Sequence, residues 1–196
     1  MAEETIILDF FGPFSWRGSA EAPSIFGATV ARQSGIYMWT ISVEGSELVY
    51  YVGETGRDFE TRMLEHFREH CSGGYHIYSP SEFRHGMKIP LWPGRYDPAE
   101  RTTVADFVVK APELWPAILD LINIYRFFLA PLQYDRRLRE RIEGAIAAHL
   151  YGQKGPVGDF QDRGIRYRPR MSKEAPIAVA IGSWEMFRGL PPALEV

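Results

Sequence analysis

Four side chains in the first third of the chain have the types and the spacing needed to act on a phosphate group. Tyr37 and Tyr51 lie near matching positions of two strand-like segments, so one hairpin register would bring both phenol groups to the same face. Arg62 and His66 are one helical turn apart, a spacing that places both side chains on one face of a helix. Arginine binds phosphate oxygens with a planar pair of donors, and a phenol or an imidazole can accept a proton from water. We expect these four side chains to converge on a phosphate.

The segments that carry these residues predict a β-hairpin followed by a helix. Residues 35–43 and 47–53 are rich in aromatic and β-branched side chains, and residues 44–46 between them are typical of a turn. After Asp58, which can cap a helix, apolar residues recur with helical spacing until about Cys71. The hairpin would therefore carry the two tyrosines, and the helix would carry the arginine and the histidine.

The following part of the chain predicts a second helix, a third strand and a third helix. Residues 113–122 show helical apolar spacing, and residues 124–129 form an apolar run that predicts a buried strand. Asp135 can cap the third helix, which would end at Gly152. Residues 72–112 contain several glycines and prolines and are expected to form a long loop with short elements.

These elements predict an α/β fold of the α+β type, with a small, mainly antiparallel sheet of three strands flanked by helices. Residues 35–151 would form the core of a single domain. Residues 1–34 would be an N-terminal extension with a possible strand at residues 6–8, and residues 152–196 a basic C-terminal extension with a strand at residues 177–181.

Glu143 is the candidate ligand for a divalent metal ion. It directly follows Ile142 and lies three residues before Ile146, so it falls at the border of the apolar stripe of its helix, where a carboxylate can face a cleft. Phosphodiester hydrolysis needs a Lewis acid at the leaving oxygen, and a carboxylate-bound magnesium ion would supply one. A surface ion pair with Arg139, four residues earlier, is the structural alternative. Glu140 is the second candidate ligand.

In combination, these residues resemble the motifs of the GIY-YIG nuclease family. The resemblance rests on Gly35-Ile36-Tyr37, on Tyr51-Val52-Gly53, on the pair formed by Arg62 and His66, and on Glu143, in this order along the chain. It covers roughly residues 36 to 150 and implies the fold of that family. It also implies a metal-dependent endonuclease that hydrolyses phosphodiester bonds of nucleic acid, with double-stranded DNA as the expected partner and Mg²⁺ or Mn²⁺ as cofactor.

The resemblance implies a role for each side chain. Tyr37 would be the general base, His66 would accept or relay the proton, and Arg62 would contact the scissile phosphate. Tyr51 and Gly53 would belong to the substrate-binding part of the site, and the glutamate would hold the metal. A free phenol has a pKa of about 10, so the site is expected to lower the pKa of Tyr37 through the positive charge of the arginine and the metal.

One residue of the family's pattern is missing. Relatives have an asparagine after the glutamate that supports the geometry of the active site, whereas the nearest amide here is Gln153. This difference leaves open a non-catalytic nucleic-acid-binding module with the same fold, which the acidic first third of the chain also favours. An RNA endonuclease is a further alternative, because phosphate contacts alone do not distinguish the two sugars.

Positive charge is concentrated late in the chain. The net charge is -3, but residues 1–60 carry three basic and nine acidic side chains, whereas residues 135–173 carry ten basic and five acidic ones. We call residues 163–170 the basic segment and expect it to follow a nucleic-acid backbone, although ordinary charge clustering on a solvated surface is the alternative. Its candidate phosphate-binding residues are Arg163, Arg166, Arg168 and Arg170.

Composition and length bound the class of protein. The chain has 196 residues, of which 45% are hydrophobic and 24% charged, as in a folded domain. The single cysteine, Cys71, cannot form an internal disulfide, and the sequence shows neither an apolar run of membrane-spanning length nor a typical export signal. We therefore expect a cytoplasmic protein without a membrane partner. A stand-alone nuclease of this kind would draw its specificity from residues 72–112 and 152–173, and a homodimer would supply two sites for cutting both strands.

Overall fold

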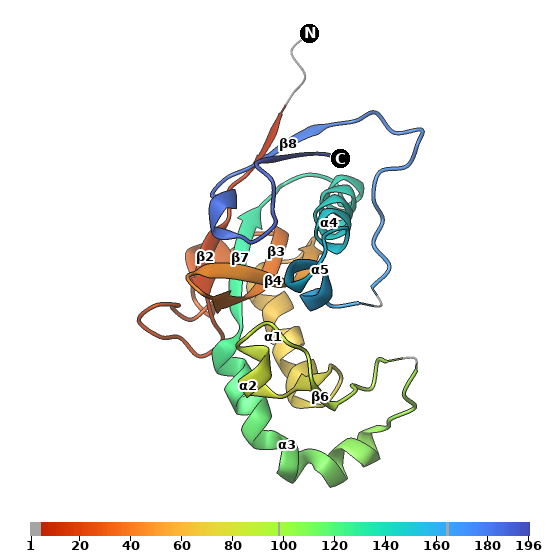
Figure 1. Ribbon diagram of the computed structural model, residues 1–196. Helices are drawn as coiled ribbons and strands as arrows, with labels where there is room; N and C mark the ends of the chain where they lie inside the picture. Colours follow the sequence, from red (N-terminus) through yellow and green to blue (C-terminus); the bar gives the residue numbers. More distant parts are fainter. Residues whose placement is uncertain (1–4, 98, 164) are drawn as a thin grey trace.

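The hairpin expected near residues 35–53 forms one side of the main sheet in the computed structural model, which describes residues 5–97, 99–163 and 165–196 (Figure 1). Strand β3 covers Gly35–Val43 and strand β4 covers Ser46–Thr55. The two residues between them have positive φ angles, 50° for Glu44 and 79° for Gly45, as a tight two-residue hairpin turn requires.

The main sheet has four antiparallel strands, one more than expected, in the order β2-β7-β3-β4. Strand β7, Arg126–Pro131, corresponds to the expected third strand. Strand β2, Phe11–Phe14, is the additional strand, and it falls in the N-terminal extension, where the sequence predicts a strand only at residues 6–8. It lies at the edge of the sheet and pairs only with β7 among the described strands, and a proline is tolerated at such an edge.

Helices cover both faces of the main sheet. The three long helices are α1, Phe59–Cys71, α3, Val104–Ile124, and α4, Arg136–Tyr151. Ile36 and Met38 of β3 pack with α4, whereas Tyr37 and Trp39 pack with α1 and α3 on the other face. In Figure 1, α4 lies above the sheet, and α1 and α3 lie below it.

A β-bulge in β4 changes the face to which its residues point. Trp39 pairs with Tyr51 and Thr40 pairs with Val49, so Tyr50 is the extra residue. Both Tyr50 and Tyr51 therefore pack on the face that carries α1, whereas strict alternation would place them on opposite faces. The bulge thus brings a second tyrosine of β4 to the same side as Tyr51.

The segment expected to be a long loop is more ordered than its glycines and prolines indicate. It contains β5, Ile77–Tyr78, α2, Pro80–Phe83, and β6, Pro90–Trp92. Helix α3 begins at Val104 and not at residue 113, with a capping box in which Thr103 and Asp106 satisfy each other's backbone N–H groups. The expected start at residue 113 directly follows Pro112, a residue typical of a helix boundary, but Pro112 lies inside the helix, as Pro116 does.

The two ends of the chain meet in a second sheet. Strand β1, Ile6–Leu8, pairs in parallel with β8, Ala178–Ile181, and β8 pairs with β9, Ala193–Glu195. The strands expected near residues 6–8 and 177–181 are therefore confirmed. The remaining short helices are α5, Pro156–Phe160, and the two 3-10 turns η1, Thr29–Arg32, and η2, Trp184–Met186. A search of the described residues found no helix with the length and apolarity needed to span a membrane.

Candidate active site

The Tyr37 hydroxyl lies between the side chains of Arg62 and His66. The Tyr37 oxygen accepts a hydrogen bond from Arg62 Nε at 3.1 Å and lies 2.8 Å from His66 Nε2. The rings of Tyr37 and Tyr51 are also close, with 5.9 Å between their centroids. Helix α1 starts where expected, with the Asp58 side chain accepting from the Thr61 N–H, and this start fixes the direction in which Arg62 and His66 project. The four side chains expected to converge are thus found together.

The Tyr37 oxygen accepts from Arg62, because a guanidinium can only donate. We assign the Tyr37 hydrogen to the contact with His66 Nε2. His66 then carries its proton on Nδ1, which lies 2.7 Å from the Tyr75 hydroxyl. With this assignment, His66 Nε2 accepts a hydrogen bond from the Tyr37 hydroxyl and could receive its proton.

Burial controls the charges of the cluster. Tyr37 is fully buried, and this raises its pKa above the usual value even though Arg62 lowers it in part. The expected lowering of the Tyr37 pKa is therefore wrong for the protein alone, because desolvation is the larger effect. Burial lowers the pKa of His66 well below its usual value, and the charge of Arg62 lowers it further. At neutral pH the cluster holds a neutral phenol, a neutral imidazole and one guanidinium.

Gly53 leaves the space that the Tyr37 ring occupies. It lies opposite Tyr37 in the hairpin register. A Cβ atom at this position would lie 2.3 Å from Tyr37 Cζ and 2.7 Å from Tyr51 Cε1, so no side chain fits. Gly53 is itself buried, and in this structure it leaves room for the Tyr37 ring; its expected contact with substrate stays a prediction.

Glu143 reaches the free edge of β4 from the opposite face of the sheet. Its Oε1 accepts a hydrogen bond from the backbone N–H of Glu54 at 3.0 Å. Burial and the carboxylate of Glu54 raise the pKa of Glu143 to about 7, and the charge of Arg62 lowers it in part. The expected alternative, a surface pair with Arg139, is not what forms: Arg139 Nε lies 3.0 Å from Glu54 Oε2. Glu143 is thus held near the Tyr37 cluster by the strand edge.

Glu140, the second candidate metal ligand, is surrounded by arginines. Its carboxylate lies 2.9 Å from Arg136 Nε, 3.6 Å from Arg168 Nη1 and 3.9 Å from Arg137 Nη1. These positive charges would repel a metal ion at this position. The geometry therefore favours Glu143.

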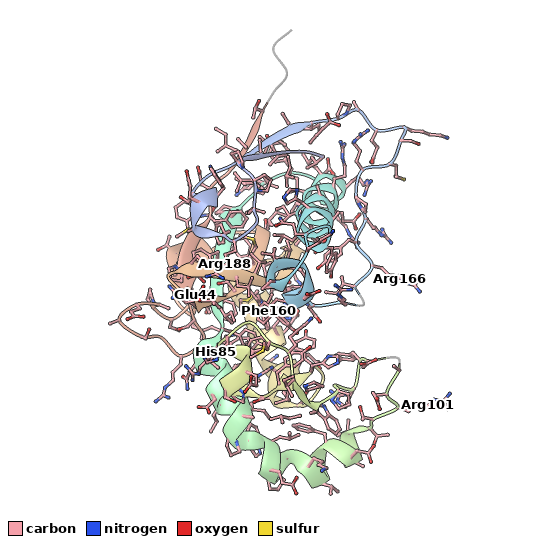
Figure 2. The ribbon with its side chains drawn as sticks, viewed as in Figure 1. Glu44, His85, Arg101, Phe160, Arg166 and Arg188 are labelled. Atoms are coloured by element: carbon pink, nitrogen blue, oxygen red, sulfur yellow. The ribbon has the colours of Figure 1, made fainter. Side chains whose placement is uncertain are left out.

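The basic segment runs along α4, and its arginines differ in exposure. Arg137 fastens the segment by donating to two of its backbone carbonyls, at 2.8 and 2.9 Å. The side chains of Arg163 and Arg168 are 66% and 69% exposed, and Arg166 points away from the body of the molecule (Figure 2). Arg170 is only 33% exposed and lies 3.3 Å from a carboxylate of the C-terminal strand. Arg163, Arg166 and Arg168 are therefore the arginines of this segment that are available to a partner.

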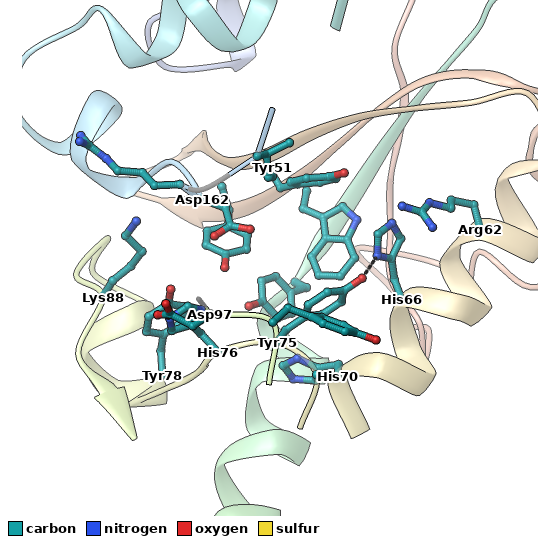
Figure 3. A pocket seen from close by; sticks show the side chains of 17 residues that line it. Tyr51, Arg62, His66, His70, Tyr75, His76, Tyr78, Lys88, Asp97 and Asp162 are labelled. Atoms are coloured by element: carbon teal, nitrogen blue, oxygen red, sulfur yellow. Dashed lines mark hydrogen bonds and ion pairs between the residues drawn. The ribbon is translucent and has the colours of Figure 1, made fainter. Parts of the chain in front are cut away.

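A pocket of about 570 Å³ opens beside the Tyr37 cluster (Figure 3). Tyr51, Arg62 and His66 line one end of it. The other end is lined by His76, Lys88, Asp97 and Asp162, none of which is a candidate residue from the sequence (Figure 3). Arg163 of the basic segment, next to Asp162 in the chain, also lines the pocket. The pocket was missed because its second half comes from the presumed loop and from the residues after α5.

One local signal for this pocket exists in the sequence. Residues 75–78 read Tyr-His-Ile-Tyr, an unusual density of ring side chains for a loop. Tyr75 contacts His66, and the rings of His76 and Tyr78 stack with 5.6 Å between their centroids. The signal indicates a structured wall, but it does not reveal which other residues complete it.

The site combines a cation for phosphate oxygens, a neutral imidazole reached through a phenol, and a partly buried carboxylate. Within the described residues, no group of three or more His, Cys, Asp or Glu side chains is placed to hold a metal ion. Comparisons of the chain with protein-family models, with curated proteins and with solved structures found no match.

Proposed function

We propose that this protein is a nuclease of the GIY-YIG type that hydrolyses phosphodiester bonds of DNA. The observation that carries the proposal is the position of the Tyr37 hydroxyl between Arg62 Nε and His66 Nε2. The order of elements, with hairpin, helix, antiparallel third strand and glutamate-bearing helix, supports it. A cation and a proton acceptor that share one phenol group suit attack on a phosphate ester.

The proton path of the proposed reaction runs from water through Tyr37 to His66. The attacking water gives its proton to the Tyr37 oxygen while the Tyr37 hydroxyl passes its own proton to His66 Nε2, so the phenol ends neutral and the imidazole charged. This route avoids a free phenolate, which the raised pKa of Tyr37 disfavours. Tyr37 is fully buried, so water reaches its oxygen when the Arg62 side chain, 30% exposed, moves toward a bound phosphate.

Glu143 is the residue that fits a magnesium ion in this proposal. Burial and the nearby Glu54 carboxylate raise the pKa of Glu143 to about 7, and a divalent cation at this position would favour the carboxylate form. Magnesium is commonly bound through one or two carboxylates and retains several waters, so a single glutamate suffices. When bound, the ion would act as a Lewis acid at the leaving oxygen.

A nucleic acid is the partner that the exposed arginines of the basic segment favour. Arg168 lies beside the glutamate-bearing helix, 3.6 Å from Glu140, and Arg163 lines the pocket that also contains Arg62. Phosphates contacted there would place the backbone of the nucleic acid across the mouth of the pocket.

The proposal is tested by plasmid nicking with wild-type protein and the Tyr37→Phe variant, each in magnesium, manganese and chelator. Tyr37→Phe keeps the buried ring and removes only the hydroxyl that joins Arg62 to His66. We expect metal-dependent nicking by the wild type and a loss of at least about a hundredfold in the variant. The matched control is Tyr134→Phe, since Tyr134 is exposed and outside the cluster. A Tyr37→Phe protein that nicks like the wild type contradicts the proposed proton path.

A non-catalytic binding module remains the second candidate, because the Tyr37 oxygen is covered and the Tyr37 pKa is raised. Such a module would bind DNA and leave it intact in every metal. Binding measured beside nicking separates the two functions, since the wild type either cuts the DNA that it binds or does not.

A further inference from the structure

The pocket beside Arg62 has polar groups in its wall that the protein leaves without partners. In the described part of the chain, Trp39 Nε1 and both ring nitrogens of His70 are buried and have no hydrogen-bond partner. Both residues line the pocket, and both are at most 3% exposed. Buried polar groups without partners are costly and uncommon in native proteins. These nitrogens have less than 1 Å² of exposed surface each, so a ligand with polar atoms would reach them when the rings of the pocket wall shift.

The chemistry of His70 narrows the kind of ligand. Burial lowers the pKa of His70 to about 4, so the ring is neutral at physiological pH and offers one donor and one acceptor. Trp39 offers a further donor. A ligand that pairs with such groups is compact and carries both hydrogen-bond donors and acceptors. The part of the ligand that contacts His70 and Trp39 carries no charge.

The walls of the pocket are built largely of aromatic rings. Tyr50, Tyr51, Tyr75, Tyr78 and Tyr125 line it together with Trp39. The rings of Tyr51 and Tyr75 lie 6.0 and 6.4 Å from that of Trp39, and Tyr50 and Tyr125 are 5.8 Å apart. A pocket of about 570 Å³ is large enough for one flat heterocycle with its sugar.

The charges of the pocket are unequal along its length. Arg62 stands at one end, and the carboxylates of Asp97 and Asp162 lie at the other with Lys88 and with His76, whose Nε2 is 3.2 Å from Asp97 (Figure 3). Arg163, next to Asp162 in the chain, also lines the pocket, so this far end holds charges of both signs, whereas the Arg62 end offers a phosphate a cation without a carboxylate among the described residues of the pocket wall. The far end suits amino and imino groups, which can donate to carboxylates.

We infer that this pocket binds one nucleobase, that of a nucleotide whose phosphate contacts Arg62. The inference rests on the proposed function, which makes the ligand part of a nucleic acid. The pocket itself is the evidence that a base binds there. Because a base inside a duplex cannot enter such a pocket, the nucleotide must leave the base stack, or the substrate must be unpaired at that position. Stacking on the aromatic walls offsets the cost of unstacking.

The test uses calorimetric titration of the full-length protein in chelator, so that binding is measured without cleavage. The probes are inorganic phosphate, deoxyribose 5-phosphate and the four deoxynucleoside 5′-monophosphates. At least one mononucleotide should bind about tenfold or more tightly than deoxyribose 5-phosphate, since stacking of a base contributes that much. Equal affinities for deoxyribose 5-phosphate and all four mononucleotides would overturn the inference.

Two variants connect the base to the unpartnered groups. His70→Leu, of similar volume, should weaken mononucleotide binding about fivefold and leave deoxyribose 5-phosphate unaffected, without lowering the melting temperature, because no hydrogen bond within the protein is removed. Trp39→Phe provides the same comparison if the first variant does not fold. His85→Leu is the matched control, because His85 lies outside the pocket (Figure 2). Mononucleotide binding unchanged in both pocket variants would refute the role assigned to these groups.

A plasmid-nicking assay on the same wild-type preparation separates this inference from the proposed function. If the protein nicks the plasmid but binds mononucleotides no more tightly than deoxyribose 5-phosphate, the base pocket is refuted and the nuclease proposal stands. If it binds mononucleotides more tightly but does not nick the plasmid, the base pocket stands and the nuclease proposal is refuted.

Discussion

The most sensitive position in the candidate site is Gly53, which has no side chain of its own to lose. In Gly53→Ala, the new Cβ would lie 2.3 Å from Tyr37 Cζ, whereas ordinary contacts begin near 3.4 Å. The Tyr37 ring must therefore move by about 1 Å, and a displacement of this size in a catalytic group can cost about a hundredfold in rate. Forcing an extra carbon into a packed core should also lower the free energy of unfolding by about 1–3 kcal/mol.

Urea denaturation and plasmid cleavage measure these two effects. Gly152→Ala is the matched control, because Gly152 ends α4 in a helical conformation and its added Cβ would meet only helix carbonyls, the nearer at 3.3 Å. The double variant Tyr37→Leu with Gly53→Ala tests the cause directly: the cost of the alanine should shrink once the ring is gone. If Gly53→Ala unfolds and cuts like the wild type, the close packing of Tyr37 against β4 does not position the site.

Three further predictions follow from the charges of the site and of the basic segment. Arg62→Lys should fold normally but lose about a hundredfold in kcat/KM, because lysine lacks the planar pair of donors; wild-type kinetics would make Arg62 a structural residue. Glu143→Gln should raise the free energy of unfolding at pH 8 by on the order of 2 kcal/mol and change it little at pH 4, as urea denaturation at both pH values can measure. The stabilisation is expected at high pH because folding raises the pKa of this carboxyl to about 7, so its ionisation destabilises the folded state as the pH rises through that value. An equal effect of the substitution at both pH values would contradict this prediction. Replacing Arg163, Arg166 and Arg168 by Ala should lower the slope of log affinity against log salt concentration by nearly one for each phosphate that the variant no longer binds. An unchanged slope would mean that these arginines face solvent and do not contact the nucleic acid.

The part of the site that could be predicted from the sequence is the part made by short-range geometry. The hairpin fixes Tyr37 and Tyr51 relative to each other, and one helical turn fixes Arg62 relative to His66. Asp58 marks the start of that helix in the sequence as well as in the structure. These relations depend on periodicity and capping alone.

The rest depends on contacts between residues far apart in the sequence. The hydrogen bond between Glu54 and Glu143 joins residues 89 positions apart, and nothing near either residue predicts it. Tyr50 points to the site because of a bulge, and a bulge is not encoded by the alternation of side chains. The half of the pocket that includes Asp162 comes from segments without clear periodicity.

Electrostatics could not be predicted because burial was unknown. From the sequence, the positive charge of Arg62 is the visible influence on Tyr37, and it predicts a lowered pKa. In the structure Tyr37 has no exposed surface, and desolvation reverses the direction. The proton acceptor in the proposed reaction is therefore His66, which is uncharged at neutral pH because burial lowers its pKa and which that lowering makes a weak base.

The most direct test of a metal-dependent active site at the edge of β4 compares cleavage of a plasmid by wild-type protein and by Glu143→Gln in magnesium. DNA binding is measured in parallel, and Glu113→Gln, an exposed change on α3, is the control. We predict that the wild type and the control cut the plasmid, that chelator stops them, and that Glu143→Gln binds DNA without cutting it. Cleavage by Glu143→Gln at close to the wild-type rate, or no cleavage by the wild type in any divalent metal, would contradict the account.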